Sequence, residues 1–332
     1  MKYSVAMPEL IGQLLRAHLT RADRQEDLCF AVWKPSRGRT RNTALIADVV
    51  LPGSGDRLVH GNASFQPQYV ERAISAALAA DGGIAFLHSH PARGWQDMSA
   101  DDIRAETLLA PTAVGATGLP LVGLTLGAFD GTWSARVWEK VGPKKYQRQW
   151  AESVREVGER LVVHFADKLV PPPVHRQSQV RTVASWGPDV QARIARLKVG
   201  VVGLGSVGSM VAEALARTGI QNVTLIDYQQ LEEVNLDRTL NASQKDVGRA
   251  KVALAADALR INATAGSFVV DPHIGSVCEE AGYRKALDCD VLFSCVDRPW
   301  GRSVLNYVAY AHLIPVIDGG TPGIKNEARK AA

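Results

Sequence analysis

Two histidines that follow an apolar run form the first group of residues able to do chemistry. In FLHSHP, His88 and His90 are two residues apart, and because the side chains of a strand alternate between its faces, both imidazoles project from the same side. Catalytic zinc sites use three protein ligands and keep a fourth position for water, so two neutral imidazoles are two-thirds of such a site. The segment PARGWQDMSADDI then offers three carboxylates as the third ligand: Asp97, Asp101 and Asp102. The pattern predicts a catalytic zinc site, although Ser99 followed by Asp102 is also typical of a helix N-terminus.

A glycine-rich turn forms the second group. KVGVVGLGSVGSMVAEALARTG combines a buried strand, a GxGxxG turn (Gly203, Gly205, Gly208) and an amphipathic helix. The glycines let the backbone approach a phosphate or ribose closely, and the helix N-terminus favours negative charge. Asp227 ends the next strand, NVTLID, where its carboxylate can accept hydrogen bonds from a ribose hydroxyl. On these residues alone, a nicotinamide-dependent dehydrogenase is the default interpretation.

Charged residues further along the chain favour a triphosphate. LEEVNLDRT places Asn235 and Arg238 three apart, and VGRAKVALAADALRIN places Lys251 at the start of a helix. Asp297 in SCVDRPWGR follows a strand, in the crevice where a Mg²⁺ ligand is expected. These positions predict a site for ATP with Mg²⁺.

The string HSHP followed by SADD resembles the JAB/JAMM (MPN-type) zinc metalloprotease family, whose signature is an upstream Glu, then HxHP, then S-x-x-D. The resemblance covers roughly residues 5–140 and implies that zinc is held by His88, His90 and Asp102. It also implies that Ser99 stabilises an oxyanion, and that Glu26 in QEDLCFAV is the general base and acid acting on the zinc-bound water.

The register of the third zinc ligand has two solutions. The family usually carries S-x-x-D one residue closer to the second histidine, which puts Met98 at the Ser position and Asp101 at the Asp position. We favour a one-residue insertion in the loop, because Ser99 then keeps its spacing to Asp102, and Asp101 remains the alternative.

The segments DYQQLEEVNLDR, VGRAK and CVDRPWGRSVLN closely resemble the ThiF/MoeB-type adenylation domain, the fold of ubiquitin-activating enzymes and their bacterial relatives. The resemblance implies Asp227 on the ribose, Asp297 on Mg²⁺, and a polar set on the phosphates: Asn235, Arg238 and Lys251. RTVASWGPDVQARIARL is similar to the arginine-bearing helix before the family's glycine loop, so Arg181 is expected to reach the ATP γ-phosphate, often across a homodimer.

Two departures from the ThiF/MoeB pattern affect these expectations. Gln229 stands where the family has a second acid after the ribose Asp. The chain ends at VIDGGTPGIKNEARKAA, where the family continues with further strands, any Cys-based zinc site and the catalytic cysteine. We therefore expect a second domain that is incomplete at its C-terminus, and no thioester transfer by this chain.

The elements that must position these residues fall into three parts. Residues 1–142 are expected to form the JAB/MPN-like α+β domain, with an amphipathic helix over 7–22, a hairpin of 28–33 with 44–51, and a helix over 69–80. One-sided apolar spacing predicts a helix over 146–169, so residues 143–180 are interpreted as a helical connector ending in Pro171–Pro173. Residues 181–332 then alternate strands and helices, which predicts a Rossmann-like, doubly wound ThiF-type α/β domain.

Composition limits the classes of function. The 332 residues are 46% apolar and 22% charged, with a formal net charge of +4 and four cysteines without CxxC spacing. The cysteine pattern indicates a reducing compartment, and the scattered arginines give no nucleic-acid patch. Neither a signal peptide nor a membrane-length apolar run is evident, so we expect a soluble, cytoplasmic protein that binds no membrane.

Together the two halves predict a bacterial-type protein that processes and activates a ubiquitin-like partner. The first half would cleave an (iso)peptide bond at the partner's C-terminus, and the second would adenylate that C-terminus with ATP. A conjugating enzyme is the expected further partner. The alternatives are a non-catalytic scaffold that binds ubiquitin-like tails with one or neither site active, and an NAD-dependent oxidoreductase.

Overall fold

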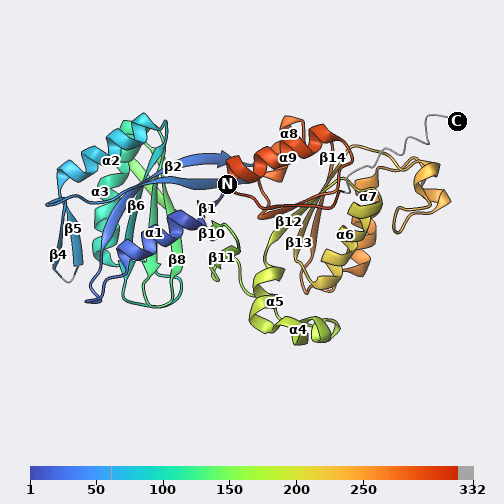
Figure 1. Cartoon of the computed structure of the whole chain (residues 1–332), viewed down its shortest axis with the longest axis horizontal. Helices are drawn as coiled ribbons and strands as arrows, with labels where there is room; N and C mark the ends of the chain where they lie inside the picture. The colour runs from blue at the N-terminus through green and yellow to red at the C-terminus, as the bar shows by residue number, and fades with distance from the viewer. Residues whose placement is uncertain (61, 321–332) are drawn as a thin grey trace. The chain divides into compact units, whose positions relative to one another are not determined.

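The computed structural model describes residues 1–60 and 62–320, which divide into two units, Met1–Pro172 and Pro173–Ala332. Each unit is built on its own sheet (Figure 1). Within the described residues, no helix combines the length and apolarity needed to cross a lipid bilayer.

The first unit is centred on a mixed sheet of nine strands among the described residues. Their order across the sheet is β11 (Leu161–Phe165), β10 (Ser153–Val157), β1 (Lys2–Pro8), β3 (Arg41–Val50), β2 (Leu28–Arg37), β6 (Gly83–His90), β7 (Leu121–Gly127), β8 (Thr132–Gly142) and β9 (Lys145–Trp150). A separate pair, β4 (Arg57–His60) with β5 (Asn62–Phe65), is antiparallel.

Apolar side chains on both faces of this sheet are covered. On one face α1 (Glu9–Leu19) buries Leu15 and Leu19 against Val5 and Leu87. On the other face α2 (Pro67–Ala79) and α3 (Ala100–Thr117) pack on Phe30 and its neighbours. This two-sided burial holds β6, the strand that carries both histidines, in the interior of the sheet.

The predicted helix over 146–169 is wrong, and so is the helical connector assigned to residues 143–180. The segment forms β9, β10 and β11 and completes the sheet of the first unit. Gly158 disfavours a helix at this point, and the β-branched residues on either side of it favour extended backbone. The apolar positions 161, 163 and 165 satisfy a strand's period as well as a helical stripe.

The start of the chain also differs from the prediction. Residues 2–8 form β1, which pairs in parallel with both β3 and β10. The helix expected over 7–22 is shorter, from Glu9 to Leu19. The predicted hairpin is correct, since β2 and β3 pair antiparallel.

The second unit is a doubly wound α/β fold, as predicted. Its described sheet has five parallel strands in the order β14 (Val269–Ile274), β13 (Asn222–Asp227), β12 (Lys198–Val202), β15 (Val291–Ser294) and β16 (Val316–Asp318). Helices α6 (Ser206–Thr218) and α7 (Lys251–Asn262) pack on one face, through Val201 among others. Helices α8 (Glu280–Ala286) and α9 (Pro299–His312) pack on the other, through Val202 (Figure 1).

A fully buried ion pair of the first unit joins α3 to β8. Arg136 donates from Nε to Glu106 Oε2 at 3.0 Å and from Nη2 to Oε1, and both side chains are 0% exposed. Trp138 Nε1 donates to the same carboxylate at 2.6 Å. Trp138 would still donate to Oε2 without Arg136, but Arg136 supplies the hydrogen bond to Oε1 and the cation that pairs with the buried carboxylate.

Replacing Arg136 with Met should destabilise the first unit by about 3–5 kcal/mol, because the Glu106 carboxylate is left buried without its cation. The measurement is urea unfolding followed by circular dichroism. Lys168→Met is the control, since Lys168 and Asp97 are 84% and 70% exposed and such a pair contributes about 0–1 kcal/mol. Equal stability of the two variants would contradict this role for the buried pair.

Candidate functional site

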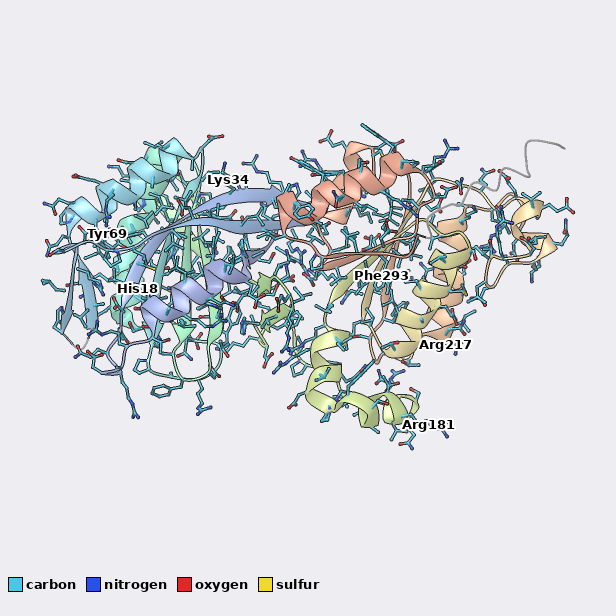
Figure 2. The ribbon with its side chains drawn as sticks, viewed as in Figure 1. His18, Lys34, Tyr69, Arg181, Arg217 and Phe293 are labelled. Atoms are coloured by element: carbon cyan, nitrogen blue, oxygen red, sulfur yellow. The ribbon has the colours of Figure 1, made fainter. Side chains whose placement is uncertain are left out.

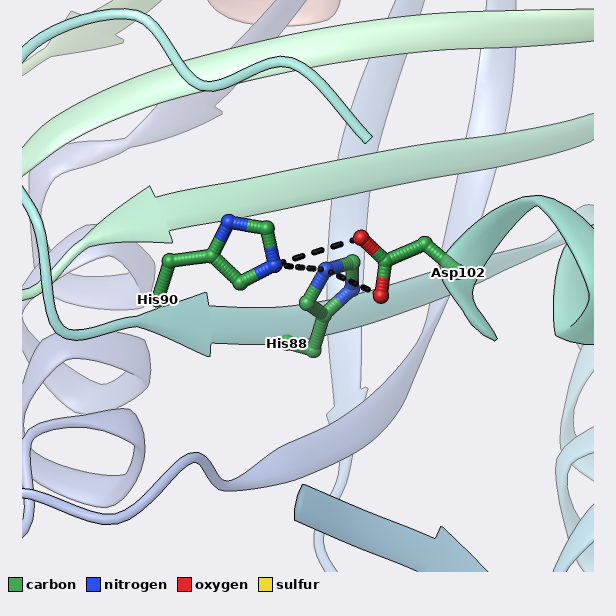
Figure 3. A group of neighbouring side chains, drawn as sticks. All are labelled: His88, His90 and Asp102. Atoms are coloured by element: carbon green, nitrogen blue, oxygen red, sulfur yellow. Dashed lines mark hydrogen bonds and ion pairs between the residues drawn. The ribbon is translucent and has the colours of Figure 1, made fainter. Parts of the chain in front are cut away.

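Three predicted zinc ligands converge in the first unit. His88 and His90 lie at the end of β6, and Asp102 lies in the first turn of α3 (Figure 3). His88 Nε2 is 3.2 Å from Asp102 Oδ1, and His90 Nε2 is 3.2 Å from Asp102 Oδ2. The ligand atoms of all three residues lie within 4.8 Å of one another.

Local backbone geometry accounts for this convergence. The strand period puts both imidazoles on one side of β6, as the sequence predicts. Ser99 caps α3, because its Oγ accepts from Asp102 N at 3.2 Å while Asp102 Oδ2 accepts from Ser99 N at 2.7 Å. The helix-capping role of Ser99 and Asp102 therefore coexists with the predicted site, and the cap orients the carboxylate toward the histidines.

The three aspartates of the loop have different surroundings. Asp101 has a side chain that is 66% exposed and lies 3.5 Å from Arg104. Asp97 pairs with Lys168 at 3.0 Å. Among the described residues, Asp102 is the carboxylate that joins the two histidines in a potential metal cluster.

The electrostatics of this cluster suit a cation. Burial would raise the pKa of Asp102, but hydrogen bonds from His88 and His90 hold it well below its usual range. Burial lowers the pKa of His88. Burial also opposes protonation of His90, yet the hydrogen bond to Asp102 and the charges of Asp102 and Glu26 together outweigh it, so the pKa of His90 is raised.

The donor set fits zinc. The Nε2 atoms of His88 and His90 lie 3.2 Å apart, and each lies 3.2 Å from an oxygen of Asp102. Two imidazole nitrogens with one carboxylate oxygen are ligands that zinc accepts. His88, His90 and Asp102 are the residues that would hold it.

Glu26 lies beside this cluster. Its Oε1 is 3.9 Å from His90 Nε2, and burial raises the pKa of Glu26. The neighbouring Asp27 donates from its backbone N to Ser89 Oγ at 3.1 Å and accepts from Ser89 N at 3.0 Å. The segment that carries Glu26 is thus held against β6 between the two histidines.

Several residues around the cluster escaped the sequence analysis. Arg57 on β4 makes two hydrogen bonds to the Asp27 carboxylate. Thr125 on β7 lies 3.3 Å from His88 Nε2 and accepts from Arg136 Nη1 at 2.5 Å. These contacts follow from strand pairing between segments that are far apart in the sequence, so no local spacing of residues predicts them.

The second unit contains a pocket of about 1230 Å³ at the carboxyl ends of β12, β13 and β15. Its lining includes most of the predicted nucleotide-binding residues: Gly203, Gly205, Asp227, Asn235, Arg238, Lys251 and Asp297. The structure therefore brings together residues that are separated by nearly a hundred positions in the sequence.

The glycines of the turn have different structural roles. Gly203 has a φ of +89°, and a Cβ there would lie 2.7 Å from the carbonyl oxygen of Cys295. Gly208 is absent from the pocket lining among the described residues. A Cβ at Gly208 would collide with the carbonyl oxygen of Gly203, so Gly208 permits close packing of α6 on the turn.

Asp227 is buried and braces the turn. Its Oδ2 accepts from Leu204 N at 2.6 Å, and its Oδ1 accepts from Gln229 N at 2.7 Å. Each carboxylate oxygen has a second lone pair, so these bonds leave acceptor capacity at the pocket wall.

The cations of the pocket differ in exposure. Lys251 is 7% exposed, and its Nζ donates to Gln229 Oε1 at 2.8 Å. Arg238 is exposed and its Nη1 donates to Val234 O and Asp237 Oδ1, each at 2.7 Å. Lys251 Nζ donates to a neutral amide rather than to a carboxylate, so an anion in the pocket can pair with it directly, whereas Arg238 must exchange partners to reach one.

Arg181 does not line this pocket. It lies on α4 (Val180–Trp186), where its side chain is exposed (Figure 2). Within the described residues of one chain, Arg181 therefore does not lie where it could contact a γ-phosphate in this pocket.

Residues 177–329 match the ThiF family. The chain is 39% identical over 153 residues to the tRNA threonylcarbamoyladenosine dehydratase of Escherichia coli, covering 45% of this chain and 55% of that protein. It is 31% identical over 133 residues to the molybdopterin-synthase adenylyltransferase of Escherichia coli, and the match covers 40% of this chain and 52% of that protein. It is also 31% identical over 144 residues to the NEDD8-activating enzyme E1 catalytic subunit of Dictyostelium discoideum. That match covers 40% of this chain and 32% of that protein.

The crystal structure of the E. coli dehydratase in complex with ATP matches this chain with 29% sequence identity and a TM-score of 0.41. The match covers 45% of this chain and 60% of that one. The chain spans about half the length of the first two curated relatives.

The metal site has a direct test. Replacing His88 and His90 together with Ala should abolish binding of one zinc per chain, because it removes two of three ligands. Asp102→Ala should weaken zinc binding strongly while Asp101→Ala leaves it unchanged, as measured by metal analysis after dialysis. Stoichiometric zinc in the double variant would refute the site, and an effect of Asp101→Ala alone would move the third ligand.

Proposed function

We propose that this protein activates the C-terminus of a ubiquitin-like protein by ATP-dependent adenylation in its second unit. The observation that carries the proposal is the single pocket that gathers Asp227, Lys251 and Asp297 at the carboxyl ends of parallel strands. Doubly wound sheets bind nucleotides in that crevice. The relatives named as an adenylyltransferase and an E1 subunit favour adenylation and a ubiquitin-like substrate.

In the proposed reaction, a carboxylate oxygen of the substrate attacks the α-phosphorus of ATP. A bond forms between that oxygen and phosphorus, the bond to the β-phosphate oxygen breaks, and pyrophosphate leaves. Lys251, Arg238 and Asn235 hold the phosphates, and Asp227 accepts from the ribose. Asp297 is the proposed Mg²⁺ ligand, and Mg²⁺ supplies charge neutralisation on the phosphates.

Two partners are part of the proposal. Because Arg181 lies outside its own chain's pocket, it would serve the γ-phosphate only from a second copy of the chain. A conjugating enzyme would receive the activated C-terminus.

We further propose that the first unit hydrolyses an (iso)peptide bond at the same ubiquitin-like C-terminus. The specific observation is the convergence of His88, His90 and Asp102 beside Glu26. Zinc at this site would supply Lewis acidity for water activation and carbonyl polarisation. Cleavage at the C-terminus exposes the carboxylate that the second unit adenylates, so both units act on one substrate.

The residues around the metal site have distinct proposed roles. The pKa of Glu26 is raised, and its Oε1 lies 3.9 Å from the proposed ligand atom His90 Nε2. Glu26 is therefore placed to take a proton from water at the metal site and to return it to the leaving amine. Ser99 Oγ accepts from Asp102 N, so its own hydroxyl proton is available to an oxyanion.

Adenylation requires MgATP binding, and this binding has a sharp test. Lys251→Ala should weaken MgATP by roughly ten- to a hundredfold, because it removes a charged hydrogen bond from a buried site. Asp297→Ala should weaken MgATP while sparing metal-free adenosine. Calorimetry measures both, with Lys245→Ala as the control, since Lys245 is exposed in the segment before α7 and lies outside the pocket lining.

Preference for NAD over MgATP, with Lys251→Ala silent, would favour an oxidoreductase. MgATP binding without pyrophosphate exchange in the presence of a ubiquitin-like protein would favour a scaffold that binds without turnover.

Turnover in the first unit is tested at Glu26. Glu26→Gln should retain zinc and lose roughly 10²- to 10⁴-fold in hydrolysis of a ubiquitin-like C-terminal extension, because the amide cannot carry the proton. The assay is cleavage of that extension with zinc content measured in parallel, and the exposed Glu71→Gln is the control. Unchanged cleavage by Glu26→Gln would assign the proton transfer to another group.

A further inference from the structure

One polar atom in the wall of the nucleotide pocket has no partner. Thr239 lines the pocket and is 9% exposed, and its Oγ1 is buried without a hydrogen bond among the described residues. Buried hydroxyls are nearly always hydrogen-bonded, because an unmade bond costs the desolvation of the group. The missing partner of Thr239 needs an explanation.

The backbone holds Thr239 at the pocket. Thr239 N donates to Asn235 O at 2.9 Å, and the next residue, Leu240, donates from N to Ser209 Oγ at 3.1 Å on α6. The backbone of Thr239 is thus fixed on both sides, so only rotation of the side chain can move its hydroxyl.

The surroundings of Thr239 identify the kind of partner. The preceding residue is Arg238, and the same pocket wall carries Asn235 and the buried Lys251. A wall with two cations and an amide attracts an anion with several acceptor oxygens, and a hydroxyl complements such an anion as a donor. Rotation about χ1 can turn the threonine hydroxyl into the position that its methyl group occupies, without moving the backbone.

We propose that Thr239 is a further phosphate-binding residue, whose hydroxyl donates to a phosphate oxygen of the bound nucleotide. The inference rests on the proposed nucleotide site and adds to it a residue outside the predicted set. The ligand-free protein holds this hydroxyl unsatisfied, and the nucleotide supplies its acceptor. Thr239 therefore contributes to nucleotide affinity at the expense of the stability of the free protein.

A single substitution should change nucleotide affinity and the stability of the ligand-free protein in opposite directions. Thr239→Val keeps the shape of the side chain and removes the hydroxyl, so the ligand-free protein should melt at the same temperature or higher. The same variant should bind MgATP about tenfold more weakly or worse, because it lacks a hydrogen bond to a charged oxygen. Its affinity for adenosine, which has no phosphate, should not change.

Two controls separate binding from structure. Thr239→Ser keeps the hydroxyl and should bind MgATP within about twofold of the wild type. Thr264→Val removes a hydroxyl that is satisfied by Arg217 O at 2.9 Å outside the pocket lining. That variant should lower the melting temperature and leave MgATP affinity unchanged.

Calorimetry with MgATP and adenosine, and thermal melting of each full-length variant, decide the matter. MgATP affinity of Thr239→Val equal to that of the wild type would overturn the inference and leave the nucleotide site standing. Equal losses for adenosine and MgATP, or a lower melting temperature of the free variant, would assign Thr239 a structural role instead. No MgATP binding by the wild type would overturn the nucleotide site and this inference together.

Discussion

The register of hydrogen-bonded strands is the constraint on which both candidate sites depend. In the first unit β6 pairs with β2 and β7, so that His88 lies opposite Leu28 on one side and Thr125 on the other. A shift of one residue would turn both histidines to the opposite face. In the second unit, parallel pairing of β12 with β13 and β15 brings Val202, Ile226 and Ser294 level, and the pocket opens just beyond them.

Features specified over short stretches of sequence were predictable. The spacing of His88 and His90 predicts their common face, and Ser99 with Asp102 predicts the cap that aims the carboxylate. The same holds for Gly203 and Asp227, which stand at the ends of consecutive strand signals. Each of these relations spans only a few residues or one strand–helix–strand unit. The backbone geometry of that local unit is therefore enough to determine how its residues lie relative to one another.

Relations between distant segments were not predictable in the same way. The helix expected over 146–169 failed because β10 gains a partner in β1, almost the full length of the unit away. Tertiary pairing overrides an ambiguous apolar period. The contact of Arg136 with Thr125 depends on the β7–β8 register, and no spacing in the sequence distinguishes Thr239 from any other threonine of a loop.

The pairing of β1 with β10 also has a consequence for synthesis of the chain. Val5 lies opposite Val154, so β1 must wait for nearly 150 further residues to be synthesised before one of its two neighbours exists. Until then the edge of β1 that will face β10 presents unpaired amides and carbonyls beside apolar side chains, the kind of edge on which other chains aggregate. Folding of the first unit is therefore dominated by a late, long-range closure.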